Sequence, residues 1–231
     1  MLQAHYPQLQ TCIAPGLADA VADWDETRLT YLPTGQDCPR FSFQHILCPG
    51  DERVWAGLTW QIHPAPGHDP HAVILFEPIH RVLVSADALW EHGFGVVFPE
   101  IEGEDGFSGI AQTLELITSL QPRWVVPGHG NVFQDVDAAL ARARARLQSF
   151  VSAPTKHANH AAKVLLKFKL LDWQRIDRDR LMHWACCCRF LVLLHQRYFC
   201  AMDLSDWVEQ LMHDLVKAQV ARQDQHDWVN I

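Results

Sequence analysis

Two histidines and one aspartate in this sequence come directly after apolar runs, where a strand would end. His68 and His129 each follow a Pro-Gly dipeptide, and Asp87 follows the run Val82-Leu83-Val84-Ser85-Ala86. Glycine lets the backbone turn sharply, so that the imidazole after it can face a cavity. Two neutral imidazoles and a carboxylate form a partial ligand set for zinc or a similar ion. If the three strands end at one sheet edge, the sequence predicts a metal site at His68, Asp87 and His129.

Each of these motifs also has a plainer interpretation. A Pro-Gly-His sequence is more often an ordinary turn than a metal site, and Asp87 could equally cap the segment that follows it. The order His, Asp, His, at intervals of 19 and 42 residues and with each member at a strand end, is more specific than any one motif alone.

Short apolar runs bounded by glycine and proline predict buried strands in the first part of the chain. These runs are residues 54–61, 72–76, 81–85 and 124–126. Between the last two runs a helix is predicted, because Ile110, Leu114 and Ile117 share one face, and Ser108 is its expected cap. Strands mixed with a helix predict a layered α/β core.

Helical spacing dominates the rest of the chain. Apolar residues recur at helical intervals over four stretches, 136–147, 161–171, 181–192 and 208–216. Asp135, Asp177 and Ser205 precede the first, third and fourth stretches as expected caps, and Pro154 ends the first helix. The last residues, 227–231, predict one short strand.

Composition excludes some classes of protein. With 231 residues, 48% hydrophobic and 20% charged, the chain can bury a core and is not a disordered tail. A net charge of −8 argues against wholesale nucleic-acid binding, although the charge is uneven, at −12 over residues 1–135, +7 over 136–190 and −3 over 191–231. We therefore predict two domains, residues 1–153 and 154–231.

The expected location is the cytoplasm. No uncharged apolar run reaches the roughly 18 residues that cross a bilayer, so no membrane partner is expected. Residues 1–20 show no secretion signal. The seven cysteines are odd in number and contain no Cys-x-x-Cys pair, which argues against a disulfide framework or a cysteine zinc site. The oligomeric state stays open.

Three motifs together resemble the later metal motifs of metallo-β-lactamase-fold hydrolases. They are Pro66-Gly67-His68-Asp69-Pro70-His71, Ser85-Ala86-Asp87-Ala88-Leu89 and Pro127-Gly128-His129-Gly130, and the resemblance covers residues 1 to about 150. It implies an α/β fold, part of an αββα sandwich, in which His68 completes the first metal site, Asp87 bridges two metals and His129 binds the second. Serine and alanine replace the commoner glycine before Asp87.

Four further residues lie close to these motifs in the sequence. Asp69 and His71 would lie beside the ligands and hydrogen-bond to them, or would simply make the loop polar. Trp90 and His92 belong to a segment rich in glycine and aromatic residues that suits a substrate pocket. A surface position is the alternative for His92.

The family's signature His-x-His-x-Asp-His, which supplies four of the usual seven ligands, does not occur in this sequence. The opening, residues 1–9, resembles the helix that normally follows it. The resemblance therefore predicts a fold that is incomplete at its N-terminus, through a misplaced start codon, a truncated gene or a deliberate fragment. Where the intact family holds two zinc ions, we expect weak or partial zinc binding here.

The implied activity is metal-dependent hydrolysis, in which a metal-activated water attacks an ester, thioester, lactone or phosphodiester of a small-molecule substrate. The sequence does not indicate which of these substrates is hydrolysed. The alternative is a non-catalytic remnant or binding protein that keeps the second half of the fold. Residues 155–231 resemble the helical, winged-helix-like extension of one branch of the family. This extension would pack on the core, or its basic stretch would attract RNA.

Overall fold

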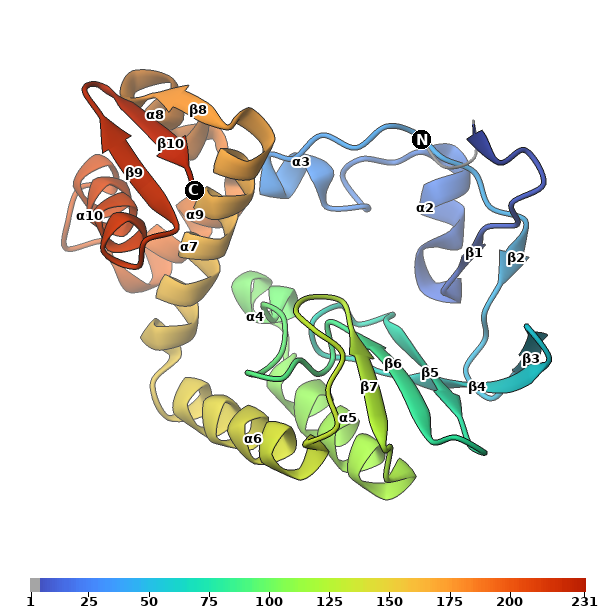
Figure 1. Cartoon of the computed structure of the whole chain (residues 1–231). Coiled ribbons are helices and arrows are strands. Elements are labelled where there is room, and N and C mark those ends of the chain that lie inside the picture. The colour runs from blue at the N-terminus through green and yellow to red at the C-terminus, as the bar shows by residue number, and fades with distance from the viewer. Residues whose placement is uncertain (1–4) are drawn as a thin grey trace. The chain divides into compact units, whose positions relative to one another are not determined.

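The structure is a computed structural model that describes residues 5–231. Within these residues the chain forms two compact units (Figure 1). Unit 1 contains residues 5–29, Pro39–Gly95 and Asp105–Leu147, and unit 2 contains Thr30–Cys38, Val96–Glu104 and Gln148–Ile231. The predicted helical domain, 154–231, lies within unit 2, which also takes in two earlier segments. The domain boundary at residue 153 stays a prediction.

A five-stranded sheet forms the centre of unit 1. Its strands follow the order β3-β4-β5-β6-β7, and all neighbours are antiparallel except β6 and β7, which are parallel. The strands are β3 (Glu52–Trp55), β4 (Leu58–Pro64), β5 (Val73–Glu77), β6 (Val82–Ala86) and β7 (Trp124–Pro127). The run 54–61, predicted as one strand, is instead a hairpin, because Ala56 and Gly57 have positive φ angles of 51° and 77° and turn the chain.

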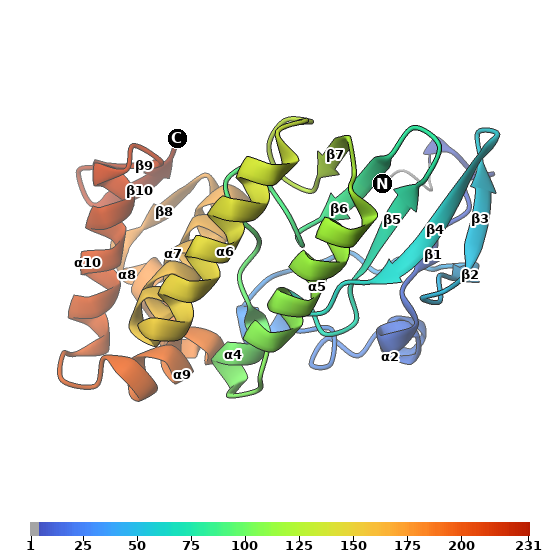
Figure 2. The same cartoon turned by 90° about the horizontal axis from the view of Figure 1, so that it is seen from below.

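Two helices, α5 (Phe107–Leu120) and α6 (Val136–Ser152), lie along one face of this sheet (Figure 2). The cross-strand neighbours Phe76, Leu83 and Val125 are buried, and so are the predicted helix positions on α5. Ser108 is not the cap of α5; it lies inside the helix, and its backbone N–H donates to Asp105 Oδ1 at 3.1 Å. The predicted cap of α6 is confirmed, because Asp135 Oδ1 accepts from the N–H of Ala138 at 3.4 Å.

The first part of unit 1 is built from small elements. β1 (Cys12–Ile13) pairs in parallel with β2 (His45–Ile46), and between them come the short helix η1 (Pro15–Leu17) and α2 (Ala18–Asp23). The helix expected over residues 1–9 falls partly on residues 1–4, which lie outside the described residues. Tyr6 to Leu9 form a turn, in which the N–H of Leu9 donates to the carbonyl of Tyr6.

Unit 2 is helical and also contains a three-stranded antiparallel sheet. Its helices are α3 (Tyr31–Thr34), α4 (Phe98–Glu102), α7 (Pro154–Trp173), α8 (Arg178–Cys187), α9 (Arg189–Tyr198) and α10 (Leu204–Lys217). Its strands, in the order β8-β10-β9, are β8 (Arg175–Asp177), β10 (Asp227–Asn230) and β9 (Ala221–Asp224). The predicted terminal strand is confirmed as β10, whereas β8 and β9 were not predicted.

Residues 30–38 are fastened to the later helices of unit 2 through Gly35. The carbonyl of Gly35 accepts from Lys169 Nζ at 3.0 Å and from Trp184 Nε1 at 3.1 Å. Cys188 Sγ lies 3.5 Å from the carbonyl of Thr34, and at Cys188 the backbone is extended. The helix predicted over 181–192 is therefore two helices, α8 and α9, which meet at Cys188.

Residues 96–104 are also tied to later helices of unit 2. The N–H of Val97 donates to the buried imidazole of His157 at 3.2 Å, and Arg189 pairs with Glu102 at 3.0 Å. Among residues 5–231, no helix is both long enough and apolar enough to cross a membrane.

Candidate metal centre

The sheet topology of unit 1 explains why three candidate ligands converge. β6 and β7 are parallel neighbours, so Asp87 and His129, which follow them, lie at the same edge of the sheet. β4 is antiparallel to β5, and β5 is antiparallel to β6, so β4 runs in the same direction as β6 and also ends at that edge. The loop after β4 carries His68. The strand order thus brings together the three positions that the sequence singled out.

The carboxylate of Asp87 lies between the two imidazoles. Its Oδ2 is 3.5 Å from His68 Nε2, and its Oδ1 is 3.7 Å from His129 Nε2. All three side chains reach solvent, with exposed fractions of 26% for His68, 30% for Asp87 and 61% for His129. Each imidazole therefore has its own carboxylate oxygen. The three residues do not form a group in which every ligand atom lies within 4.8 Å of the others.

These distances fit metal ligands better than hydrogen bonds. A hydrogen bond between an imidazole and a carboxylate has a separation of about 2.7–3.2 Å. Two ligands at about 2.0–2.2 Å from one zinc ion, at a tetrahedral angle, lie roughly 3.4 Å apart. The His68–Asp87 pair and the His129–Asp87 pair each match two corners of such an arrangement. The two imidazoles and the carboxylate have the chemistry of metal ligands, and they would be the residues that hold metal ions here.

Two glycines, Gly95 and Gly128, lie close against these candidate ligands. A Cβ atom at Gly95 would lie 2.6 Å from His68 Nδ1, and one at Gly128 would lie 2.8 Å from Asp87 Oδ1. Real Cβ atoms essentially never approach a neighbour this closely. The position of Gly95 against His68 was not predicted, because the sequence around Gly95 contains no metal motif.

The remaining candidates near the site occupy different positions. Trp90 Nε1 donates to Asp87 Oδ1 at 3.0 Å, whereas the side chain of His92 is 80% exposed. The carboxylate of Asp69 accepts from the N–H of His71 at 2.6 Å and so forms a local turn. A ligand-bonding role for Asp69 and His71, and substrate contact by Trp90 and His92, stay predictions.

A cavity of about 390 Å³ opens beside the ligands within unit 1. Its polar lining includes His68, Asp69, His71 and Asp87, and aliphatic side chains from β5 and from residues 13–29 supply most of the rest. Within the part of the chain that the structure describes, its lining includes neither Trp90 nor His92.

His63 on β4 lies five residues before His68 in the sequence. Its Nε2 is buried and has no hydrogen-bond partner among residues 5–231, and burial lowers the pKa of the imidazole from its ordinary value. His63 therefore favours the neutral form at neutral pH.

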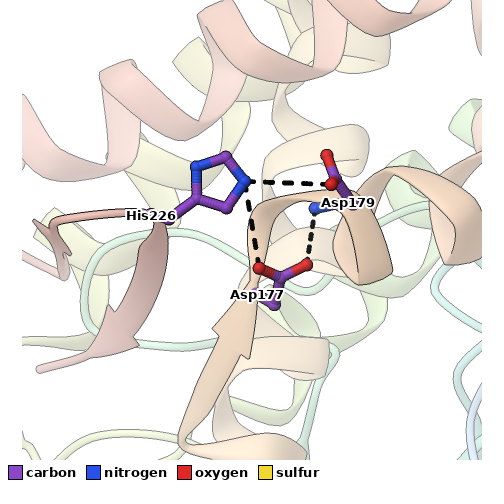
Figure 3. A group of neighbouring side chains, drawn as sticks. All are labelled: Asp177, Asp179 and His226. Atoms are coloured by element: carbon purple, nitrogen blue, oxygen red, sulfur yellow. Dashed lines mark hydrogen bonds and ion pairs between the residues drawn. The ribbon is translucent and has the colours of Figure 1, made fainter.

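Unit 2 contains a second group of metal-ligand types, Asp177, Asp179 and His226 (Figure 3). His226 Nε2 lies 3.9 Å from a carboxylate oxygen of Asp177 and 3.8 Å from one of Asp179. All three are exposed. Asp177 already serves as the N-cap of α8, since it accepts from the N–H groups of Asp179 and Arg180. Capping and surface ion pairs account for this group.

Comparison with known proteins identifies the family. A family model described as the metallo-beta-lactamase superfamily matches residues 13–129. Among solved structures, a metallo-beta-lactamase family protein from Thermus thermophilus is 16% identical, with 99% of this chain and 67% of that one covered and a TM-score of 0.43. A beta-lactamase domain protein from Burkholderia ambifaria is 15% identical, with 96% and 64% covered and a TM-score of 0.49.

A third structure, of a protein named TTHA1623 in a di-iron-bound form, is 22% identical, with 62% and 67% covered and a TM-score of 0.46. The chain spans about two thirds of the length of these structures. No curated protein matches it significantly. The matched segment, 13–129, is just over half of the 231 residues and contains His68, Asp87 and His129. The chain therefore belongs to the metallo-beta-lactamase superfamily.

Proposed function

We propose that this chain carries the second half of a two-metal hydrolase centre for small-molecule substrates. The observation that carries the proposal is the position of the Asp87 carboxylate between His68 and His129. Metal ions held there would lower the pKa of a water molecule and polarise the carbonyl or phosphoryl group of an ester, thioester, lactone or phosphodiester.

The chain's own residues hold and orient the ions in this proposal. His68 with Asp87 would provide two ligands for one ion, and His129 with Asp87 would provide two for the other. Imidazole and carboxylate ligands suit zinc, which we propose as the metal, and they suit iron as well.

The number of ligands sets the expected affinity. Structural zinc sites with four protein ligands bind with about 10–16 kcal/mol. Two protein ligands per ion would supply about half of that, about 5–8 kcal/mol, which corresponds to a dissociation constant between about 1 μM and 0.2 mM. We therefore propose that the 231-residue chain binds zinc weakly and that its hydrolytic activity is impaired.

Calorimetric zinc titration of the chain and of Asp87→Ala and His129→Ala tests the proposal. His92→Ala is the matched control, because His92 is exposed and lies outside the ligand set. We expect micromolar or weaker binding that Asp87→Ala abolishes, that His129→Ala reduces and that His92→Ala leaves unchanged. Nanomolar binding of two zinc ions would contradict the ligand count. Equal binding by all four proteins would contradict the site.

The second candidate is a non-catalytic binding protein that keeps the second half of the fold. It is favoured by the absence of a His-x-His-x-Asp-His string from the sequence, which leaves each ion with two ligands. An absence of zinc binding in the titration would support this candidate.

The contacts of the basic stretch argue against a nucleic-acid partner. Each of these cations hydrogen-bonds or pairs with another group of the protein: Arg142, Arg144, Arg146, Lys156, Lys163, Lys167 and Lys169. Lys163 and Lys169 pair with carboxylates, which offsets the charge that would attract phosphates. A winged-helix-like unit is supported by the order of its elements, which is α7, β8, α8, α9, α10, β9 and β10. We nevertheless expect no salt-dependent binding of short RNA. We propose the cytoplasm as the location of the protein.

A further inference from the structure

The Asp87 carboxylate can face both imidazoles only in a narrow range of orientations. Rotation about the bond to its carboxyl group is a soft torsion with no sharp preference. One oxygen must face His68 and the other His129, as the structure shows. A group other than His68 and His129 must therefore restrain the Asp87 carboxylate.

Trp90 is placed to provide this restraint. Its Nε1–H donates to Asp87 Oδ1 at 3.0 Å, which is a normal hydrogen-bond length. Each carboxylate oxygen has two lone pairs, so Oδ1 can accept this bond and still face His129. The indole ring also packs edge-on against His129, with ring centroids 5.0 Å apart. One side chain thus touches both the shared carboxylate and the second imidazole.

The loop that carries Trp90 is closed by its own backbone. The N–H of Trp90 donates to the carbonyl of Gly93 at 2.6 Å, and the N–H of Gly95 returns to the carbonyl of Asp87 at 2.9 Å. Gly93 has a φ angle of 136°, which a side chain would strain. The loop therefore leaves Asp87 and comes back to it within eight residues.

Two arginines of α6 hold the outer side of this loop. Arg142 Nε donates to the carbonyl of Glu91 at 2.8 Å, and Arg146 Nη1 donates to the carbonyl of His92 at 3.4 Å. The guanidinium of Arg146 also lies over the ring of Phe94, 5.5 Å from its centroid. Part of the basic stretch thus anchors the loop behind the ligands.

We propose that Trp90 is a positioning residue of the metal centre, and that Arg142 and Arg146 fix the loop from which it acts. The indole N–H holds Asp87 so that one carboxylate oxygen faces each imidazole. The hydrogen bond from Trp90 to Asp87 is present without a metal. That it positions metal ligands rests on the proposed function.

The first experiment tests the restraint without a metal. The chain has nine tryptophans, and the indole N–H signal that Trp90→Phe removes from a ¹H–¹⁵N spectrum belongs to Trp90. We expect this signal to exchange slowly with solvent, and to shift and exchange faster in Asp87→Ala. Arg142→Ala should also speed its exchange, whereas Arg144→Ala should not, because Arg144 binds Thr118 instead of the loop. An indole signal whose chemical shift and exchange rate stay unchanged in Asp87→Ala would overturn the proposal.

The second experiment measures metal affinity in Trp90→Phe, which keeps an aromatic ring beside His129 and removes only the donor. Trp55→Phe is the matched control, because Trp55 lies on β3 at the opposite edge strand from β7. Loss of a hydrogen bond to a metal ligand weakens binding by about 10- to 100-fold. We expect a loss of about ten-fold in cobalt or zinc affinity for Trp90→Phe, with its melting temperature close to that of Trp55→Phe.

The two experiments separate this inference from the proposed function. Equal affinity of Trp90→Phe and Trp55→Phe would overturn the positioning role while leaving the metal site intact. If the unaltered chain bound no metal, the proposed function would fail, and the indole signal would still decide whether Trp90 holds Asp87.

Discussion

Replacing Gly95 by alanine should disturb the proposed metal centre while leaving the rest of unit 1 folded. The new Cβ would lie 2.6 Å from His68 Nδ1 and 3.0 Å from Asp87 Cβ, whereas ordinary contacts begin at 3.4 Å. The imidazole must therefore move by about 0.8 Å, and overpacking of this kind costs about 1–3 kcal/mol. The backbone fixes the position of a Cβ atom, so the new methyl group cannot rotate away from the imidazole, and Gly95 is buried.

A shift of this size exceeds what a metal site tolerates, because ligand distances must hold within about 0.2 Å. We expect Gly95→Ala to weaken zinc binding by about ten-fold or more, and to lower the free energy of unfolding in urea by about 1–3 kcal/mol. The control is Gly57→Ala in the turn between β3 and β4, where φ is 77° and no atom lies within 4 Å. That change should cost about 1–2 kcal/mol of backbone strain and leave zinc binding unaltered. Unchanged stability and unchanged binding in Gly95→Ala would refute the packing of His68 against Gly95.

Two further predictions concern stability. Asp177→Ala should lower the free energy of unfolding by about 1 kcal/mol, because the Asp177 carboxylate caps α8. Asp203→Ala should have little effect, because Asp203 makes no side-chain cap bond at α10. Equal losses of stability in urea titrations of the two variants would contradict the capping geometry. Burial raises the pKa of Glu77, but hydrogen bonds from His80 and the N–H of Ile79 outweigh it, so the pKa lies below its ordinary value of 4.5. The stability that this ionised carboxylate gives is therefore present above about pH 4.5 and is lost as the pH falls through the lowered pKa. Glu77→Gln should make the free energy of unfolding depend less on pH at acidic pH. An unchanged dependence on pH would contradict a lowered pKa of Glu77.

The sequence predicted the parts of the fold that local patterns encode. Apolar runs and helical spacing located the strands of the sheet and most of the helices, and acidic side chains at two helix starts, Asp135 and Asp177, were confirmed as caps. The hairpin at Ala56 and Gly57 was missed, because the apolar run 54–61 is continuous across the turn. Ser108 was predicted as the cap of α5 but lies inside the helix, because the helix begins at Phe107 and the N–H of Ser108 donates to Asp105.

The convergence of the candidate site was predictable to the extent that strand ends share a sheet edge. Residue type and position suggested His68, Asp87 and His129, and the strand order brings them together. Sequence spacing alone could not reveal that Gly95 lies against His68 or that the indole of Trp90 reaches Asp87. These contacts depend on distances between loops, for which a single sequence carries no signal.

The hydrogen bonds to the Gly35 carbonyl have a consequence for how this protein folds during its synthesis. Lys169 and Trp184, whose side chains bind the Gly35 carbonyl, come 134 and 149 residues later in the chain. At ribosomal rates of about 5–20 residues per second, residues 30–38 wait roughly 7–30 s for these partners. Until then the Gly35 carbonyl lacks the two side-chain donors that bind it in the folded protein. We expect chaperones that bind short apolar peptides to recognise ribosome-bound chains that end before Lys169 more strongly than the finished protein.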